Sequence, residues 1–158
     1  MPGDPPQQSG KAPYPARGVH IQSHGPTIVF LNLCTEDRAK LLANDLVHSL
    51  LLQVWQDSPA WLIGSYLIMP DHIHIFACPH DTSIKFDDWV TYWKGQFSLR
   101  HKYSKIRWQS KPFHHRLRTQ ESYLEKLDYV RQNPVHAGLV QDSKDWPYQG
   151  TLNHLRWH

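Results

Sequence analysis

Two histidines, His72 and His74, stand two residues apart in the segment 69–78. A Pro-Asp pair directly before them predicts a turn, and the alternation of side chains after it predicts a strand. Because successive side chains of a strand point to opposite faces, both imidazoles share one face with Phe76. They can therefore reach the same metal ion or the same substrate group, although ordinary histidines at a strand end are the alternative.

A third candidate, Tyr129, lies in a segment with helical spacing. Leu127 and Val130 belong to the predicted buried stripe, whereas Tyr129 falls on one line with Glu125 and Asn133. A phenol can act as a nucleophile, and the Asn133 amide one turn later can offer an oxygen to a metal. Oxygen and imidazole ligands together suit Mg²⁺ or Mn²⁺, and an amphipathic surface tyrosine is the alternative.

Positive charge is concentrated in residues 89–120, which hold eight of the 17 Lys and Arg residues and none of the 14 Asp and Glu residues. Aromatic side chains and histidines are interleaved with these charges. Cations that pair with phosphates, beside rings that stack on bases, are typical of single-stranded nucleic-acid sites, and a solvated basic face is the alternative. The candidate DNA contacts are Lys94, Arg107, Trp108, Arg116 and Arg118.

The segments around these residues alternate between strand and helix patterns. Apolar and β-branched residues predict a strand over 27–34, and a helix over 36–56 follows with Thr35 as its N-cap. A second strand, over 61–69, forms a hairpin with the histidine strand. The predicted buried stripe of the first helix consists of Leu42, Leu46, Leu50 and Val54.

The second half of the chain continues this alternation. A second helix is predicted from the loop at 80–83 to about residue 102, and residues 106–117 predict a fourth strand that is interrupted at Pro112. The core stripe of this helix consists of Phe86, Trp89, Val90, Trp93 and Phe97.

The tyrosine helix begins after Thr119 or Ser122 as the N-cap, with Ser122 and Glu125 as a candidate capping box. Because proline lacks the N–H group that a helix interior needs, Pro134 predicts an end near Gln132. The tail, with two further tryptophans, is expected to pack back on the domain.

This order of elements predicts an α+β fold of the ferredoxin-like, split βαβ type. Its antiparallel sheet carries two helices on one face, and an extra C-terminal helix bears Tyr129. The other face of the sheet is then available for a site.

The composition predicts one folded domain over 21–158 after a disordered lead over 1–20. The sequence has no apolar run of membrane-spanning length. Its two cysteines, Cys34 and Cys78, lie in predicted strands and are typical of buried, reduced thiols, which favours a cytoplasmic location.

Three motifs resemble those of a known family. The segment 69–76 is similar to the HUH motif (two histidines flanking a hydrophobic residue) of single-strand DNA transposases and relaxases. Residues 129–140 resemble the tyrosine helix of REP-associated tyrosine transposases, and residues 107–118 resemble the segment before that helix. The similarity covers about residues 20–150, with His114 at a position where we expect an acidic residue.

The resemblance implies metal-dependent cleavage and strand transfer of single-stranded DNA at hairpin-forming palindromes, in the cytoplasm of a prokaryote near its nucleoid. Tyr129 would be the nucleophile that forms a 5′-phosphotyrosine, and His72, His74 and Asn133 would hold Mg²⁺ or Mn²⁺. The partner would be single-stranded or hairpin DNA, and the protein would act as a monomer or a homodimer.

Two other readings remain open at this point. The chain could be a non-cleaving protein that binds hairpin DNA or RNA and derives from a transposase. It could also be a metal-dependent phosphohydrolase without a covalent intermediate. Among the remaining histidines, His114, His115 and His136 are the competing ligands because they flank the site in sequence.

Overall fold

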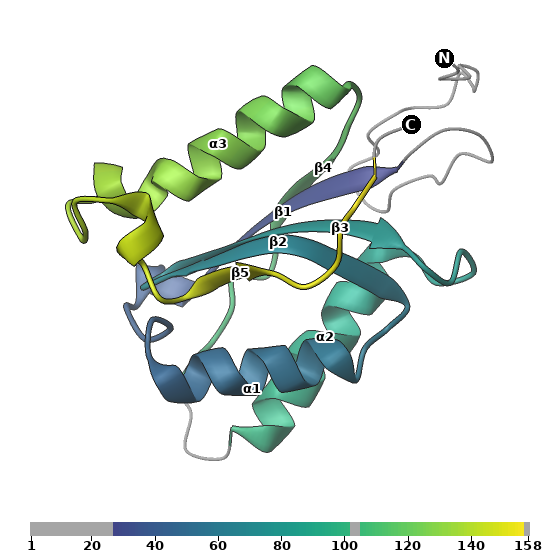
Figure 1. The fold of residues 1–158 in the computed structure, drawn as a ribbon. Helices are drawn as coiled ribbons and strands as arrows, with labels where there is room; N and C mark the ends of the chain where they lie inside the picture. Colours follow the sequence, from purple (N-terminus) through teal and green to yellow (C-terminus); the bar gives the residue numbers. More distant parts are fainter. Residues whose placement is uncertain (1–26, 102–104, 157–158) are drawn as a thin grey trace.

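Five strands form one antiparallel sheet in the computed structural model, which describes residues 27–101 and 105–156. The strand order is β4-β1-β3-β2-β5, and helices lie on both faces of the sheet (Figure 1). The strands are β1 (Ile28–Cys34), β2 (Trp61–Met69), β3 (His72–Pro79), β4 (Phe113–Leu117) and β5 (Gln149–Thr151). The helices are α1 (Asp45–Gln56), α2 (Phe86–Arg100) and α3 (Gln120–His136), and the predicted α+β class is confirmed.

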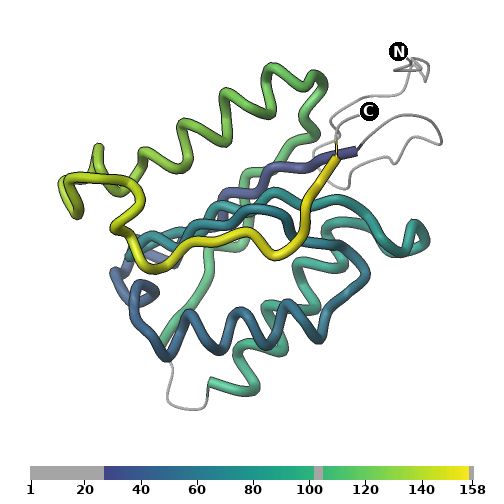
Figure 2. Tube along the Cα trace, viewed as in Figure 1, coloured from purple at the N-terminus to yellow at the C-terminus, as the bar shows by residue number. Residues whose placement is uncertain are grey.

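The connections between the strands follow a split βαβ order. Strand β3 lies between β1 and β2 and is antiparallel to both, so the two strands that α1 connects are parallel. Strand β1 lies in the same way between β3 and β4, which α2 connects. The path of the chain can be followed in Figure 2. Because short right-handed crossovers place their helices on one face, α1 and α2 cover the same side of the sheet.

The two faces of the sheet bury different parts of the histidine strand. Ile73 and Ile75 belong to the core that α1 and α2 cover, whereas Phe76 belongs to a second core that Leu127 and Val130 of α3 cover. The alternation of side chains places both histidines on the same face as Phe76, as predicted, and this is the face that α3 covers. The face that the sequence left available for a site is thus the face that the tyrosine helix occupies (Figure 1).

The predicted start of the first helix is wrong. Instead of capping a helix, the Thr35 hydroxyl donates to the carbonyl oxygens of Ala39 and Asp71. Asp37 and Arg38 take positive φ angles of 57° and 52°, so a short 3-10 turn (Glu36–Arg38) leads into an irregular segment. The helix begins only at Asp45, where the side chain of Asn44 accepts a hydrogen bond from the backbone N–H group of Val47.

This late start changes the buried stripe of α1. Leu42 lies before the helix, and its backbone N–H group donates to the carbonyl oxygen of Pro70, although its side chain is buried in the same core as α1. Leu46, which the prediction placed in the core, is 66% exposed. The buried residues of α1 are Val47, Leu51, Val54 and Trp55.

The second helix matches its predicted core stripe, all five residues of which are buried. It begins three residues after the predicted loop, at Phe86. Of the strand predicted over 106–117, only the part after Pro112 forms β4, and the part before it holds a single isolated bridge at Trp108. A 3-10 turn (Ser143–Asp145) and the edge strand β5, which pairs with β2, were not predicted. The tail does pack back, since Trp146 is buried and its indole N–H donates to the carbonyl oxygen of Ile68.

Helix α3 ends later than predicted. Its capping box joins Thr119 to Ser122, which confirms Thr119 as the N-cap and excludes the box between Ser122 and Glu125. The helix continues through Pro134 to His136. A proline in the last turn removes only one backbone hydrogen bond, and Pro134 is buried here. Asn133 is therefore helical, one turn after Tyr129.

The predicted lead over residues 1–20 and the tail residue Trp157 lie outside the described residues. Neither cysteine forms a disulfide, as predicted, although Cys34 and Cys78 are partly and not fully buried. Burial raises the pKa of both thiols. None of the helices in 27–101 and 105–156 combines the length and the hydropathy that a membrane span requires.

Candidate active site

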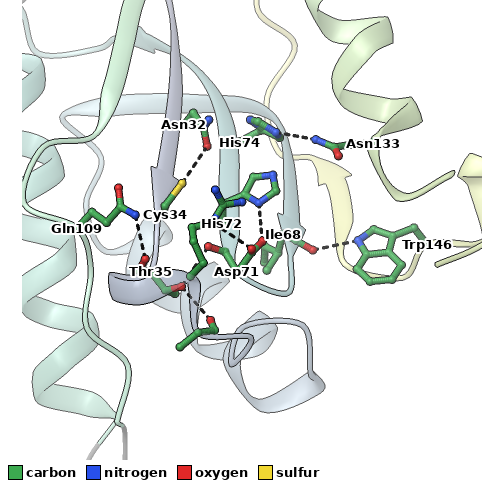
Figure 3. A network of polar contacts seen from close by, with 12 residues as sticks. Asn32, Cys34, Thr35, Ile68, Asp71, His72, His74, Gln109, Asn133 and Trp146 are labelled. Atoms are coloured by element: carbon green, nitrogen blue, oxygen red, sulfur yellow. Dashed lines mark hydrogen bonds and ion pairs between the residues drawn. The ribbon is translucent and has the colours of Figure 1, made fainter. Parts of the chain in front are cut away.

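The first histidine of the pair is held by its neighbour in the hairpin turn. The Nδ1 atom of His72 lies 2.8 Å from Oδ1 of Asp71 (Figure 3). Because Nδ1 makes this hydrogen bond, Nε2 is the ring atom left to coordinate a metal. The Nε atom of Arg38 donates to the other oxygen of the same carboxylate at 3.0 Å. Burial lowers the pKa of His72 more than the Asp71 hydrogen bond raises it, so this imidazole is neutral near pH 7.

The second histidine contacts the tyrosine helix. Nε2 of His74 lies 2.9 Å from Nδ2 of Asn133 (Figure 3), and its ring stacks on Phe30 at 5.4 Å between centroids. Burial, and then the positive charges of His72 and Lys126, lower the pKa of His74 to about 3. Its Nδ1 atom is buried without a hydrogen-bond partner in the described part of the chain. Two neutral imidazoles therefore lie side by side, with ring centroids 4.7 Å apart.

The donor set of this cluster fits a divalent cation. Neutral imidazoles can coordinate a metal, and a carboxylate on the far ring nitrogen, as Asp71 provides, is the usual support of a ligating histidine. Within residues 27–101 and 105–156, no three His, Cys, Asp or Glu side chains converge on one point. The amide of Asn133, whose Nδ2 lies beside His74, would then be the third protein group to hold a cation, through its amide oxygen.

Tyr129 lies in a pocket between α3 and β4, one turn before Asn133. Leu127 and Val130 anchor α3 on the sheet, so the neighbouring stripe of the helix faces this pocket and Tyr129 remains 57% exposed. We call the cavity, of about 370 Å³, the tyrosine pocket. It is lined by His115, Arg116, Leu117, Arg118, Ser122, Glu125, Lys126 and Tyr129.

Three of the residues around this site were not singled out from the sequence. Lys126 holds its amino group 5.0 Å from the centroid of the Phe30 ring and 5.7 Å from that of Tyr129. The only sequence signal for Lys126 is its position three residues before the tyrosine. Asp71 stands directly before His72 and was assigned to the turn alone, and Phe30 is one of many apolar strand residues.

The predicted DNA contacts are divided between two sides of the sheet. Arg116, which is buried, and Arg118, which is exposed, border the tyrosine pocket. Trp108 instead packs against aromatic side chains of α2, and Lys94 is a half-buried residue of that same helix, on the face opposite α3 (Figure 1). Arg107 is exposed next to Trp108. Of the five predicted contacts, the structure thus brings only Arg116 of β4 and Arg118, which directly follows β4, close to Tyr129.

The competing histidines also separate. His115 lines the tyrosine pocket, and burial lowers its pKa, with a smaller contribution from Lys126. His114, on the opposite face of β4, pairs with Asp87 of α2 at 3.0 Å. It therefore connects β4 to α2 and does not face the histidine pair. His136 is exposed at the end of α3.

No protein-family model matches the chain, but individual proteins do. The chain is 28% identical over 137 residues to a Haemophilus influenzae protein assigned to the REP-associated tyrosine transposases, with 77% of each chain covered. It is 29% identical over 117 residues to the REP-associated tyrosine transposase of Escherichia coli, which covers 70% of this chain and 67% of the relative.

A solved structure supports the same relationship at the level of the fold. The structure of a REP-associated tyrosine transposase bound to a REP hairpin matches with a TM-score of 0.69 and 24% sequence identity. The match covers 84% of this chain and 79% of the other. The α+β architecture, with its antiparallel sheet and three helices, is therefore shared. The two sequence matches identify the chain as a homologue of the REP-associated tyrosine transposases.

Proposed function

We propose that this protein cleaves single-stranded DNA and transfers the cut strand through a covalent bond to Tyr129, at hairpins formed by repetitive palindromes. The observation that carries the proposal is the contact between Asn133 and His74, which joins the tyrosine helix to the histidine strand. The proposed substrate class is supported by the structural neighbour, a REP-associated tyrosine transposase that was solved with a REP hairpin bound.

In the proposed reaction the Tyr129 hydroxyl oxygen attacks a backbone phosphorus and loses its proton to solvent. A bond forms between phosphorus and the tyrosine oxygen, and the bond to the 3′ oxygen breaks. The leaving oxygen takes up a proton and becomes a free 3′-hydroxyl, while the 5′ side stays on the protein as a 5′-phosphotyrosine. Because the new bond is again a phosphodiester, attack by another 3′-hydroxyl can rejoin the strand without ATP.

The residues around the histidine pair would prepare the phosphate for this attack. His72, His74 and Asn133 would hold Mg²⁺ or Mn²⁺, which supplies Lewis-acid chemistry to a bound phosphate oxygen. Asp71 orients the His72 ring through Nδ1, and Phe30 supports the His74 ring by stacking. The chain's own contribution is thus to hold two neutral, buried imidazoles in a fixed orientation.

The DNA strand would enter through the tyrosine pocket. The exposed Arg118 is suited to a phosphate contact beside Tyr129, and Arg116 would act there from its buried position. Arg107 would contact more distant phosphates. Lys94 and Trp108 were proposed with them from the sequence, but they lie with α2 and we place them outside this pocket.

A covalent-adduct assay tests the proposal. The protein is mixed with single-stranded oligonucleotides that carry hairpin-forming palindromes and single-stranded flanks, with Mg²⁺ or Mn²⁺, and resolved on a denaturing gel. We expect a shifted protein–DNA band that needs the metal and falls by at least roughly a thousandfold in Tyr129→Phe, with hairpin binding retained. Tyr92→Phe is the matched control, because Tyr92 is similarly exposed but lies on α2.

The other outcomes separate the alternatives. An adduct that persists in Tyr129→Phe would contradict the assignment of the nucleophile. Tight hairpin binding without an adduct would favour the non-cleaving binding protein. Cleavage that depends on the metal but leaves no covalent band would favour the phosphohydrolase.

A further inference from the structure

Lys126 occupies an unusual place for a lysine. It is a half-buried residue of α3, and its amino group lies over the rings of both Phe30 and Tyr129, at 5.0 Å and 5.7 Å from their centroids. Lysine side chains at a surface ordinarily extend their ammonium groups into water. Here the ammonium group instead lies between a buried ring of β1 and the Tyr129 ring, which lines the tyrosine pocket.

This charge has no carboxylate partner in the described parts of the chain. Within residues 27–101 and 105–156, no ion pair or hydrogen bond joins the Lys126 amino group to an oxygen atom, although Glu125 lines the same pocket. A half-buried ammonium group that is not paired with a carboxylate can bind an anionic group of a ligand.

The helix fixes where that anion would lie. Lys126, Tyr129 and Asn133 follow one another by three and four residues, so at about 100° per residue they fall within an arc of roughly 60° on α3. One end of this row contacts His74 and the other borders the pocket between α3 and β4. A phosphate that the Tyr129 hydroxyl can attack would therefore lie within reach of the ammonium group.

We infer that Lys126 contacts the scissile phosphate of the DNA and offsets the negative charge that develops on it as Tyr129 attacks. Lys126 is then a further catalytic residue of the strand-cleavage reaction, and this assignment rests on the function proposed above. A lysine that served only to pack on Phe30 would add stability through its cation–π contact but would not respond to the charge of the substrate.

The first test measures the rate of adduct formation in a single turnover at saturating DNA. We expect Lys126→Met to react about a hundredfold more slowly than the wild type, the usual effect of removing one charge-stabilising group, and Lys126→Arg to recover most of the rate. Lys85→Met is the matched control, because Lys85 is exposed before α2, on the other side of the sheet.

The second test measures binding alone, in buffer with a chelator. The wild type maps the cleaved position in the adduct assay, and an oligonucleotide is then made with an uncharged methylphosphonate at that position. We expect the wild type and Lys85→Met to bind the charged form about tenfold more tightly than the neutral form, as for one charge-assisted contact. Lys126→Met should bind the two forms with nearly equal affinity.

The outcomes are distinguishable. Adduct formation by Lys126→Met at the wild-type rate would overturn this inference and leave the proposed function intact. Slow reaction with undiminished preference for the charged phosphate would also overturn it, because Lys126 would then act only on the fold. Failure of the wild type to form any adduct would overturn the proposed function and this inference with it.

Discussion

The burial of His74 makes the stability of the fold depend on pH. The side chain is 4% exposed, and its pKa is lowered to about 3, mainly by burial. In the unfolded chain an exposed histidine has a pKa of about 6.5. At mildly acidic pH, His74 is therefore protonated in the unfolded state but stays neutral in the folded state. Stability is therefore complete above about pH 6.5 and falls as the pH decreases toward about 3.

The size of this effect follows from the two pKa values. Between about pH 8 and about pH 5, the proton that only the unfolded chain binds lowers the free energy of unfolding by about 2 kcal/mol. The loss would approach about 5 kcal/mol only near pH 3, where other groups also titrate. Since domains of this size are stable by roughly 5–15 kcal/mol, a change of about 2 kcal/mol is readily measured.

The assay is urea unfolding followed by tryptophan fluorescence at both pH values, in buffer with a chelator so that no cation competes with the proton. The pH-dependent loss of stability should be about 2 kcal/mol smaller in His74→Gln than in the wild type. His80→Gln should behave as the wild type does, because His80 is exposed and loses no burial on unfolding. If His74→Gln lost as much stability as the wild type over this range, the burial argument would be refuted.

Two further predictions concern the support of the site. Asp71→Asn should weaken Mn²⁺ binding by about 10–100-fold in calorimetric titration, because it removes the charge that supports His72. Asp142→Asn, at an exposed site, should leave the affinity unchanged, and equal affinity in both variants would contradict the role of Asp71. Thr119→Ala should lower the free energy of unfolding by about 1 kcal/mol in urea, since it removes the cap of α3. Thr119→Ser retains the capping hydroxyl and should cost little, so equal losses in the two variants would exclude the cap as the cause.

The parts of the fold that could be predicted are those that local periodicity determines. The hairpin, the shared face of His72 and His74, and the core stripe of α2 all follow from alternation or helical spacing. The start of α1 could not be found in this way. Its position depends on a hydrogen bond between Leu42 and Pro70, which are far apart in sequence. It also depends on the positive φ angles of Asp37 and Arg38, which are not glycines and so give no sign of this conformation in the sequence.

The residues of the candidate site also separate into those that local spacing predicts and those that depend on tertiary packing. The polar stripe that carries Tyr129 and Asn133 is a property of one helix, and it was visible in the sequence. The positions of Lys126 over Phe30, and of Trp108 in the core, depend on how distant elements pack. Charge and aromatic content in a segment cannot distinguish a residue that faces DNA from one that fills the interior.

The strand β5 in the tail affects whether Tyr129 lies beside the histidines of its own chain or of a second copy. Helix α3 is preceded by β4, which pairs with β1 at one edge of the sheet, and it is followed by β5, which pairs with β2 at the other edge. Both ends of the tyrosine helix are thus fastened to the sheet that bears the histidines. Exchange of α3 between two copies of the protein, with the segment that follows it, would break the β2–β5 pairing and the hydrogen bond from Trp146 to Ile68. In the reaction proposed above, this architecture therefore favours attack by Tyr129 in cis, beside the histidines of its own chain.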